Sequence, residues 1–274
     1  MTALNTNVPA IRSFFSTHEF NPYFELFVRH ARDRDLDYGI TIQNAYTKEE
    51  TTRAHDTLQG FVNALRQEGQ SANFKAKLRS FERNPNKNCQ SLNRYLRKTL
   101  AHHTRIKIAR LDLSYQRDGS SLITIPHMMP SSTVKAHREA FLKLLKKSEV
   151  SEQLIGYAWK MESSAVKGFL HHMMLVLDEA SISNQSIINE VLQKTWGEVT
   201  EGNGLLVDCS TLTPSCKSEG TGLLEHSSKD AWAMIRKICM QMTQPDNYIK
   251  LNCGGRSFGR SEVVEKCKNR TVAE

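Results

Sequence analysis

The sequence predicts an α+β fold, in which an antiparallel sheet flanked by helices follows a mostly helical N-terminal region. Helical periodicity dominates residues 1–103. From about residue 104, segments typical of strands come in pairs, with one helical segment between successive pairs. Strand pairs separated by single helices favour an antiparallel sheet with helices packed against it. We therefore divide the chain into residues 1–103, residues 104–262 and a tail of residues 263–274.

Two helices are expected in the N-terminal region. Residues 48–67 contain no proline, and their apolar residues are spaced as one face of a helix. Residues 20–34 predict a shorter helix that opens near Asn21-Pro22. The tripeptide Asn84-Pro85-Asn86 predicts a turn, because proline lacks the N–H that a helix interior uses.

The sheet region begins with residues 106–113, which alternate apolar and polar side chains as a half-buried strand does. A turn at residues 116–120 and a partner strand from 122 to 125 predict a hairpin. Ser131, Ser132 or Thr133 then caps a helix that ends near Lys147.

The pattern continues to the end of the region. The sequence predicts strands at residues 154–161 and 170–177, a helix at 184–196, short strands at 205–207 and 222–224, and a helix at 229–242. The predicted order from residue 106 is therefore ββαββαββα.

The composition is that of a globular protein, with 39% hydrophobic and 24% charged residues and a mean hydropathy of −0.48. No run of 18 apolar residues predicts a membrane span. The N-terminus lacks the basic start and apolar block of a secretion signal, so we expect a cytoplasmic protein without a membrane partner. The six cysteines show no CxxC pair, so we expect reduced structural thiols rather than a zinc site.

Basic residues concentrate in one stretch. The net charge is +8, and between residues 75 and 110 there are eleven Lys or Arg against a single acid, Glu82. Such a block is typical either of a solvated face or of a surface that contacts phosphates, and its density favours phosphates. The expected nucleic-acid contacts are Lys75, Lys77, Arg79, Arg83, Lys87, Arg94, Arg97, Lys98, Arg105, Lys107 and Arg110.

Several segments carry a family resemblance. Residues 156–162 (GYAWKME), 167–172 (KGFLHH), 175–178 (LVLD) and 255–260 (GRSFGR) resemble the YagK/YfjJ C-terminal domain family, which is related to inovirus-type replication proteins. Residues 110–115 (RLDLSY) look like that family's first strand. The resemblance covers about residues 100–262.

The resemblance implies the fold of rolling-circle replication initiators, the HUH endonucleases. It places the strands at 106–113 and 170–177 side by side near the centre of one sheet. In active members, two histidines and a further polar residue hold a divalent metal, Mg²⁺ or Mn²⁺, that polarises the scissile phosphate. A tyrosine on a later helix attacks the phosphate, and a lysine assists.

This sequence departs from the metal-binding pattern. The family's His-x-His falls on Leu170-His171-His172, so leucine replaces the first ligand. His172 keeps its position, and Glu162 stands where the acidic ligand is expected. Successive strand residues point to opposite faces of a sheet, so His171 and His172 reach one metal together only if the strand bulges. We expect a weak or lost metal site at Glu162 and His172, with His171 either a further ligand or a packed or partly exposed side chain.

The nucleophile region departs as well. The family's tyrosine and lysine align with Gln241 and Gln244, neither of which has a nucleophilic or charged group. Pro245 ends the helix, so Tyr248 lies on a different backbone element. Tyr248 is either a relocated nucleophile or an ordinary packed side chain.

Near the C-terminus, glycines flank Arg256 and Arg260. This pattern indicates either a close approach to a phosphate or a flexible loop with two solvated arginines.

Three functions follow from these observations. The first is a DNA-binding protein built on an initiator-like domain that has lost nicking, acting in replication or regulation of a mobile element or phage. The second is an active metal-dependent tyrosine nickase. The third is a phage or satellite protein-interaction module. In the first, the helical N-terminal region supplies positive charge or contacts to a protein partner.

Overall fold

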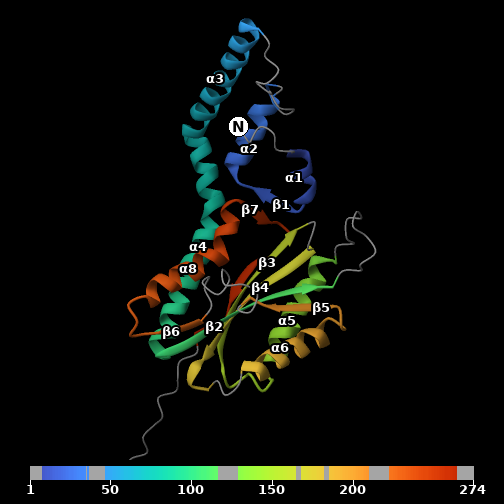
Figure 1. The fold of residues 1–274 in the computed structure, drawn as a ribbon, viewed down its shortest axis with the longest axis vertical. Helices are drawn as coiled ribbons and strands as arrows, with labels where there is room; N and C mark the ends of the chain where they lie inside the picture. Colours follow the sequence, from blue (N-terminus) through green and yellow to red (C-terminus); the bar gives the residue numbers. More distant parts are fainter. Residues whose placement is uncertain are drawn as a thin grey trace, which may run out of the picture. The chain divides into compact units, whose positions relative to one another are not determined.

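The computed structural model describes residues 8–34, 36, 47–116, 129–164, 168–181, 185–209 and 222–263. The chain forms two compact units (Figure 1). The first comprises residues 1–85 and 245–252, and the second comprises residues 86–244 and 253–274. The strand expected at 122–125 lies outside the described residues. None of the helices in the described ranges is long and apolar enough to cross a membrane.

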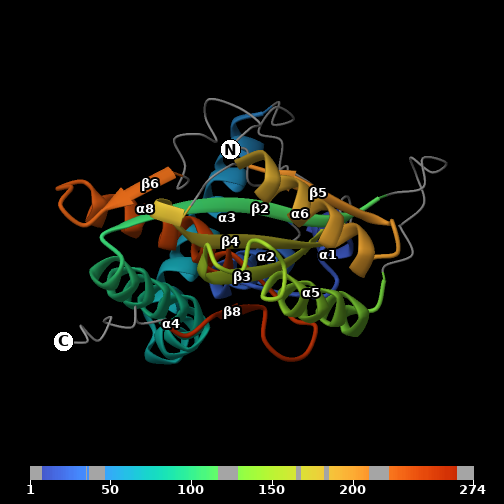
Figure 2. The same cartoon turned by 90° about the horizontal axis from the view of Figure 1, so that it is seen from below.

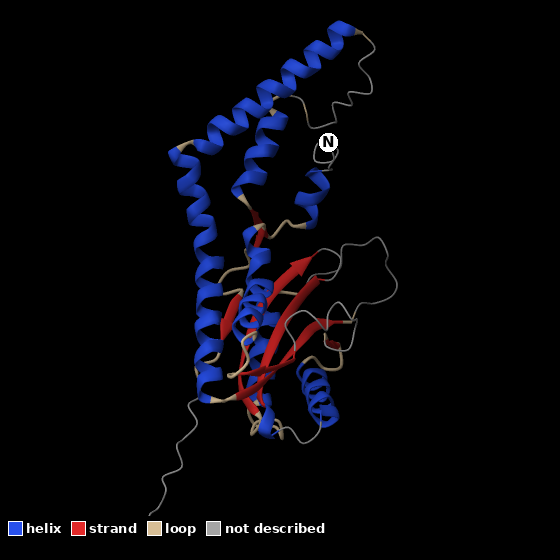
Figure 3. Cartoon of the chain, turned by 60° about the vertical axis from the view of Figure 1, so that its left-hand side comes forward, coloured by secondary structure: helices blue, strands red, loops and turns tan. Residues whose placement is uncertain are grey.

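The first unit is mainly helical (Figure 3). It contains α1 (Val8–Phe14), α2 (Pro22–Arg32), α3 (Lys48–Gln70), the start of α4 (Ala72–His102), most of the short helix η4 (Gln244–Asn247), and the paired strands β1 (His18–Phe20) and β7 (Ile249–Leu251). Both helices expected in this region are confirmed. The Asn21 side chain caps α2 by accepting a hydrogen bond from the Tyr23 N–H, and Thr47 and Glu50 form a reciprocal capping box on α3.

The turn expected at Asn84-Pro85-Asn86 is wrong, because Pro85 lies inside the continuous helix α4. A proline in a helix interior leaves the carbonyl four residues earlier without its usual donor. That carbonyl belongs to Phe81, and it accepts a hydrogen bond from the Lys250 ammonium of β7. The same ammonium lies 3.6 Å from the centre of the Phe81 ring. A lysine distant in sequence therefore supplies the donor that Pro85 removes.

The second unit is built on one antiparallel sheet of six strands. Its strand order is β5-β2-β4-β3-β8, and β6 also pairs with β2. The strands are β2 (Arg105–Tyr115), β3 (Leu154–Ser164), β4 (Gly168–Asp178), β5 (Gly204–Asp208), β6 (Gly222–Glu225) and β8 (Phe258–Arg260). The expected antiparallel α+β class is confirmed, and β2 and β4 are neighbours at the centre. The sequence did not predict β8.

One face of this sheet packs against α4 and against α8 (Ala231–Thr243). Leu92 and Leu96 of α4 share a buried core with Ile106 of β2 and Ile235 of α8. Glycine permits the close approach of α4 to β3, because a Cβ at position 156 would lie 2.1 Å from the Tyr95 hydroxyl.

The opposite face packs against α5 (Ser131–Leu145) and α6 (Gln185–Val199), which Figure 2 shows beside the strands. The Trp196 indole N–H of α6 donates to the Ser114 carbonyl of β2 at 3.0 Å. The Arg138 guanidinium of α5 lies 3.7 Å from the centre of the Trp159 ring of β3. The helices expected at 131–147, 184–196 and 229–242 are thus confirmed, with ends that differ by a few residues. The cap expected from Ser131, Ser132 or Thr133 is wrong, because the N-cap of α5 is Pro130 and no side-chain cap hydrogen bond forms.

The cysteines of the described part of the chain carry free thiols, as expected. These are Cys89, Cys209, Cys239 and Cys253. Cys216 and Cys267 lie outside the described residues.

Candidate functional site: a carboxylate–histidine cluster and a basic helix

A polar cluster lies on the three central strands of the second unit. Asp112 of β2 is the cross-strand partner of His172 of β4, and His172 is the partner of Lys160 of β3. Direct partners in adjacent strands point to the same face of a sheet, and Glu162 follows Lys160 by two residues on that face. This is the face that packs against α4 and α8. We refer to Asp112, Glu162 and His172 as the Asp–His–Glu cluster.

The His172 ring bridges two carboxylates. Its Nδ1 lies 2.7 Å from an Asp112 oxygen, and its Nε2 lies 3.2 Å from a Glu162 oxygen. The second Glu162 oxygen lies 3.7 Å from the ammonium of Lys160, whose side chain is only 2% exposed. The side chains of Asp112, Glu162 and His172 are 24–33% exposed, so solvent reaches the cluster from one side.

The two carboxylates favour the charged form of His172. Burial alone lowers the pKa of His172, but the hydrogen bonds and negative charges of Asp112 and Glu162 outweigh burial and raise this pKa to about 9. Burial likewise opposes ionisation of both carboxyls, yet the His172 hydrogen bonds keep their pKa values below the usual range. At neutral pH, His172 is therefore an imidazolium between two carboxylates.

This arrangement does not fit the Mg²⁺ or Mn²⁺ that the initiator resemblance implies. A histidine ligand must be neutral and must offer one ring nitrogen to the metal. Both ring nitrogens of His172 are occupied, and Leu170 offers no lone pair. Across the described ranges, no group of three His, Cys, Asp or Glu side chains is arranged to hold a metal ion.

His171 faces the other side of the sheet. Its side chain is fully buried, and its Nε2 donates to the Val134 carbonyl of α5 at 3.2 Å. Burial lowers the pKa of His171 to about 4, so this ring is neutral at pH 7. The opposite faces that strand alternation predicts for His171 and His172 are confirmed, and of the alternatives for His171 the packed side chain is the one observed.

The helix expected to carry a nucleophile lies on the cluster's face of the sheet. The Arg110 guanidinium of β2 donates to the Gln241 side-chain oxygen of α8 at 3.2 Å. Arg110 precedes Asp112 by two residues, so both point to this face. α8 ends at Thr243, and Gln244 and Pro245 begin η4, as the proline predicts. Tyr248 follows η4.

Tyr248 belongs to the first unit, whereas the Asp–His–Glu cluster belongs to the second. The Tyr248 side chain is 64% exposed, and it lines a largely apolar cavity of about 440 Å³ together with Phe20, Tyr23 and Phe24. Its surroundings are therefore aromatic rather than basic.

Most of the expected nucleic-acid contacts are exposed. These are Lys75, Lys77, Arg79, Arg83, Lys87, Arg94, Arg97, Lys98, Arg105 and Arg256. In the part of α4 within the second unit, Lys87, Arg94 and Lys98 are separated by seven and four residues, which puts them on one face of the helix. Leu92 and Leu96 bury the opposite face. Within the described ranges, no residue forms an ion pair with these three cations.

Other predicted contacts have partners within the protein. Arg105 pairs with Glu225 at 3.0 Å, and the Arg97 guanidinium lies 4.8 Å from the centre of the Trp232 ring. Arg260 donates to the Ser91 hydroxyl at 3.0 Å and lies over the Tyr95 ring, so it connects β8 to α4. Lys107 is half-buried.

The sequence reasoning missed two members of this site. Asp112 lies within the segment that resembles the family's first strand, but nothing in the sequence alone pairs it with His172. Lys160 lies within another such segment, flanked by Trp159 and Met161. A charged residue between two apolar ones in a central strand was the available signal, because buried charges need a partner.

Comparison with known proteins identifies the family. The YagK/YfjJ C-terminal domain matches residues 70–261, which is most of the chain. The chain belongs to this family. No curated protein and no solved structure matches the chain.

The YagK/YfjJ match begins about thirty residues earlier than the resemblance did, and it includes α4. The second half of α4 contributes Leu92, Tyr95, Leu96 and Leu100 to the core beneath the sheet. These residues explain physically why the helix and the sheet belong to one matched region. The domain boundary at residues 103/104 stays a prediction.

Proposed function

We propose that this YagK/YfjJ-family protein binds DNA through the basic face of α4 and does not cleave it. The role would be in replication or regulation of a mobile element or phage, on the plan of a replication initiator. The observation that carries the proposal is the set of exposed cations Lys87, Arg94 and Lys98 on one helix face, opposite the face that anchors α4 to the sheet. A fixed row of cations is suited to contact successive phosphates.

The Asp–His–Glu cluster supports loss of cleavage. The carboxylates that would hold a metal neutralise the His172 imidazolium instead. On α8, Gln241 takes the position expected for the nucleophile, and its side chain accepts a hydrogen bond from Arg110. Arg110 is thus hydrogen-bonded to Gln241, and His172 is hydrogen-bonded to both carboxylates, so the groups expected to act in cleavage have partners within the protein.

The first prediction concerns the α4 face. Reversing the charge of Lys87, Arg94 and Lys98 should weaken binding to duplex DNA of any sequence. It should also reduce the slope of log affinity against log salt by about 0.9 for each phosphate that the variant no longer neutralises. Fluorescence anisotropy across a range of NaCl concentrations measures both quantities.

A matched variant makes the same charge change on the opposite side of the sheet, on or just after α5 and on α6. It is Lys143→Glu/Lys147→Glu/Lys194→Glu, in which all three replaced lysines are exposed. This variant should keep most of the wild-type affinity and salt slope. Equal losses in both variants would show that only net charge matters. A salt-independent wild-type affinity would favour the protein-interaction module.

The second prediction is binding without cleavage. Labelled single-stranded DNA with Mg²⁺ or Mn²⁺ should be retained by the full-length protein without forming a covalent adduct, because no tyrosine stands at the expected position on α8. Denaturing gel electrophoresis detects an adduct directly. An adduct abolished by Tyr248→Phe would replace the proposal with the active nickase. An adduct that survives Tyr248→Phe would show that the nucleophile lies elsewhere in the chain.

A further inference from the structure

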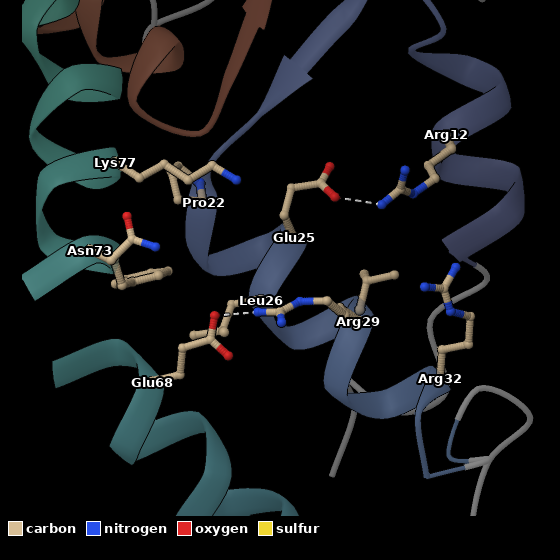
Figure 4. A pocket seen from close by; sticks show the side chains of 11 residues that line it. Arg12, Pro22, Glu25, Leu26, Arg29, Arg32, Glu68, Asn73 and Lys77 are labelled. Carbon is tan, nitrogen blue, oxygen red and sulfur yellow. Dashed lines mark hydrogen bonds and ion pairs between the residues drawn. The ribbon is translucent and has the colours of Figure 1, made fainter. Parts of the chain in front are cut away.

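A second candidate site lies entirely within the first unit, where α1, α2, α3 and α4 surround a cavity of about 470 Å³. Figure 4 shows its charged side chains gathered along α2. The charged residues that line it are Arg12, Glu25, Arg29, Arg32, Glu68 and Lys77. Leu26 and Phe74, both almost fully buried, form its apolar wall. The Asp–His–Glu cluster has no part in this cavity.

The charges in this cavity do not cancel. Arg12 pairs with Glu25 at 2.6 Å, and Arg29 pairs with Glu68 (Figure 4). Hydrogen bonds from Arg29 and His30 hold the pKa of Glu68 below its usual value, so Glu68 is ionised at neutral pH. Arg32 and Lys77 form no ion pair with any residue that the structure describes. Four cations against two carboxylates leave a net charge of +2.

The two ion pairs restrict the positions of Arg12 and Arg29. A guanidinium carries five N–H donors in a rigid fork that matches a phosphate. The ion pairs with Glu25 and Glu68 each engage a single terminal nitrogen of Arg12 and Arg29. Fixing a side chain before binding lowers the entropy cost when the ligand arrives. In Figure 4, Arg32 extends from the end of α2 on the same side as Arg12.

We propose that this cavity binds a phosphate ester. The net charge of +2 complements the dianion of a phosphate monoester. The apolar wall of Leu26 and Phe74 would take the organic part of the molecule, since ligand cavities combine apolar walls with a few placed polar groups. The same chemistry is offered by a free nucleotide and by the terminal phosphate of an oligonucleotide. This site is independent of whether α4 binds duplex DNA.

Isothermal titration calorimetry on the full-length protein tests the proposal with four probes. These are inorganic phosphate, thymidine 5′-monophosphate, a 5′-phosphorylated oligothymidylate, and thymidine without phosphate. Thymidine monophosphate should bind more tightly than phosphate or thymidine alone. Tighter binding of the oligonucleotide would identify a strand end as the source, and equal or weaker binding would identify the nucleotide. Citrate is the carboxylate control and should bind weakly.

The variant Arg12→Gln/Arg32→Gln brings the charge of the cavity to zero and should weaken binding of thymidine monophosphate about tenfold or more, the effect of losing a charge-assisted hydrogen bond. Arg32→Gln alone should show part of this loss without disturbing an ion pair. The matched control Arg53→Gln/Arg66→Gln removes two exposed arginines of α3 that do not line the cavity, and it should bind normally.

Three results would overturn the proposal: equal loss in the two double variants, thymidine binding as tightly as its monophosphate, or citrate binding as tightly as the phosphates. A gel shift with duplex DNA is run on the same samples. Because Arg12 and Arg32 lie outside α4, the double variant should shift duplex like the wild type. Absence of a duplex shift in the wild type would refute the DNA-binding proposal alone, and absence of nucleotide binding would refute this one alone.

Discussion

Adjacent histidines on the two faces of one sheet differ in charge, since one is neutral and the other is positive at pH 7. On the α5 side, burial lowers the pKa of His171 to about 4, and the ring is neutral. On the α4 and α8 side, Asp112 and Glu162 overcome the effect of burial and raise the pKa of His172 to about 9. The two residues are neighbours in sequence, and only the alternation of a strand separates them. The charge of a strand histidine is therefore set by the groups on the face of the sheet to which its side chain points.

The largest effect should come from removing the cation between the carboxylates. His172→Gln leaves Asp112 and Glu162 without their shared positive partner and should lower the free energy of unfolding by about 3 kcal/mol at pH 7, the low end for a broken buried ion pair. The low end applies because the cluster is partly exposed. Urea unfolding followed by circular dichroism measures this change.

His171→Gln is the matched substitution on the other face of the sheet, and its stability cost should be smaller than that of His172→Gln. His171 is neutral, and its Nδ1 has no hydrogen-bond partner in the described part of the chain, so the only bond at risk is the one to Val134. This variant should cost about 1 kcal/mol. Asp112→Asn should partly restore stability in the His172→Gln background, because it removes one unpaired charge. An equal loss in the free energy of unfolding for the two histidine variants would show that Asp112 and Glu162 do not add to the contribution of His172.

Regular patterns in the sequence predicted much of this arrangement. The alternation of apolar and polar residues predicted a strand at 106–113, and residues 170–177 also had the composition of a strand. The family resemblance placed these two strands side by side, and the alternation of side chains along a strand put His171 and His172 on opposite faces. Apolar residues spaced on one helix face predicted α3, and the Asn21-Pro22 pair predicted the start of α2. These features depend on neighbours along the chain, which the sequence displays directly.

Features set by distant partners were missed. The rule that proline ends a helix failed at Pro85, because Lys250 of β7 supplies a donor to the Phe81 carbonyl. Asp112 was not recognised as a site residue, because its contact with His172 depends on the register of β2 against β4. β8 has only three residues and is defined by its pairing with β3. Each of these depends on tertiary contacts that local spacing does not encode.

A smaller effect is expected on how the free energy of unfolding depends on pH, through the same two histidines. The folded pKa of His172 lies above the value of 6.5 for an unfolded histidine. Its contribution to the free energy of unfolding is therefore complete below pH 6.5 and is lost as pH rises toward 9. The folded pKa of His171 lies below 6.5, so the unfolded chain binds the extra proton and stability is lost as pH falls from 6.5 toward 4. The two histidines together place the stability maximum near pH 6.5.

The free energy of unfolding should fall by about 2 kcal/mol over the two pH units below 6.5, which we call the acid limb, and by about the same amount over the two pH units above 6.5, the alkaline limb. Urea unfolding from pH 4.5 to 8.5 measures both limbs. This range stays below 9.0, the ordinary thiol pKa at which unfolded Cys209 and Cys239 would start to lose the protons that the folded thiols, with pKa raised to about 12, retain. His172→Gln should flatten the alkaline limb and leave the acid limb, and His171→Gln should do the reverse. In His171→Gln the acid limb retains a remainder, because His172 still keeps the pKa values of Asp112 and Glu162 low and these carboxyls bind protons more readily when unfolded. An alkaline limb that persists in His172→Gln would mean that another group carries the proton, and the contrast between the two faces would then not rest on these residues.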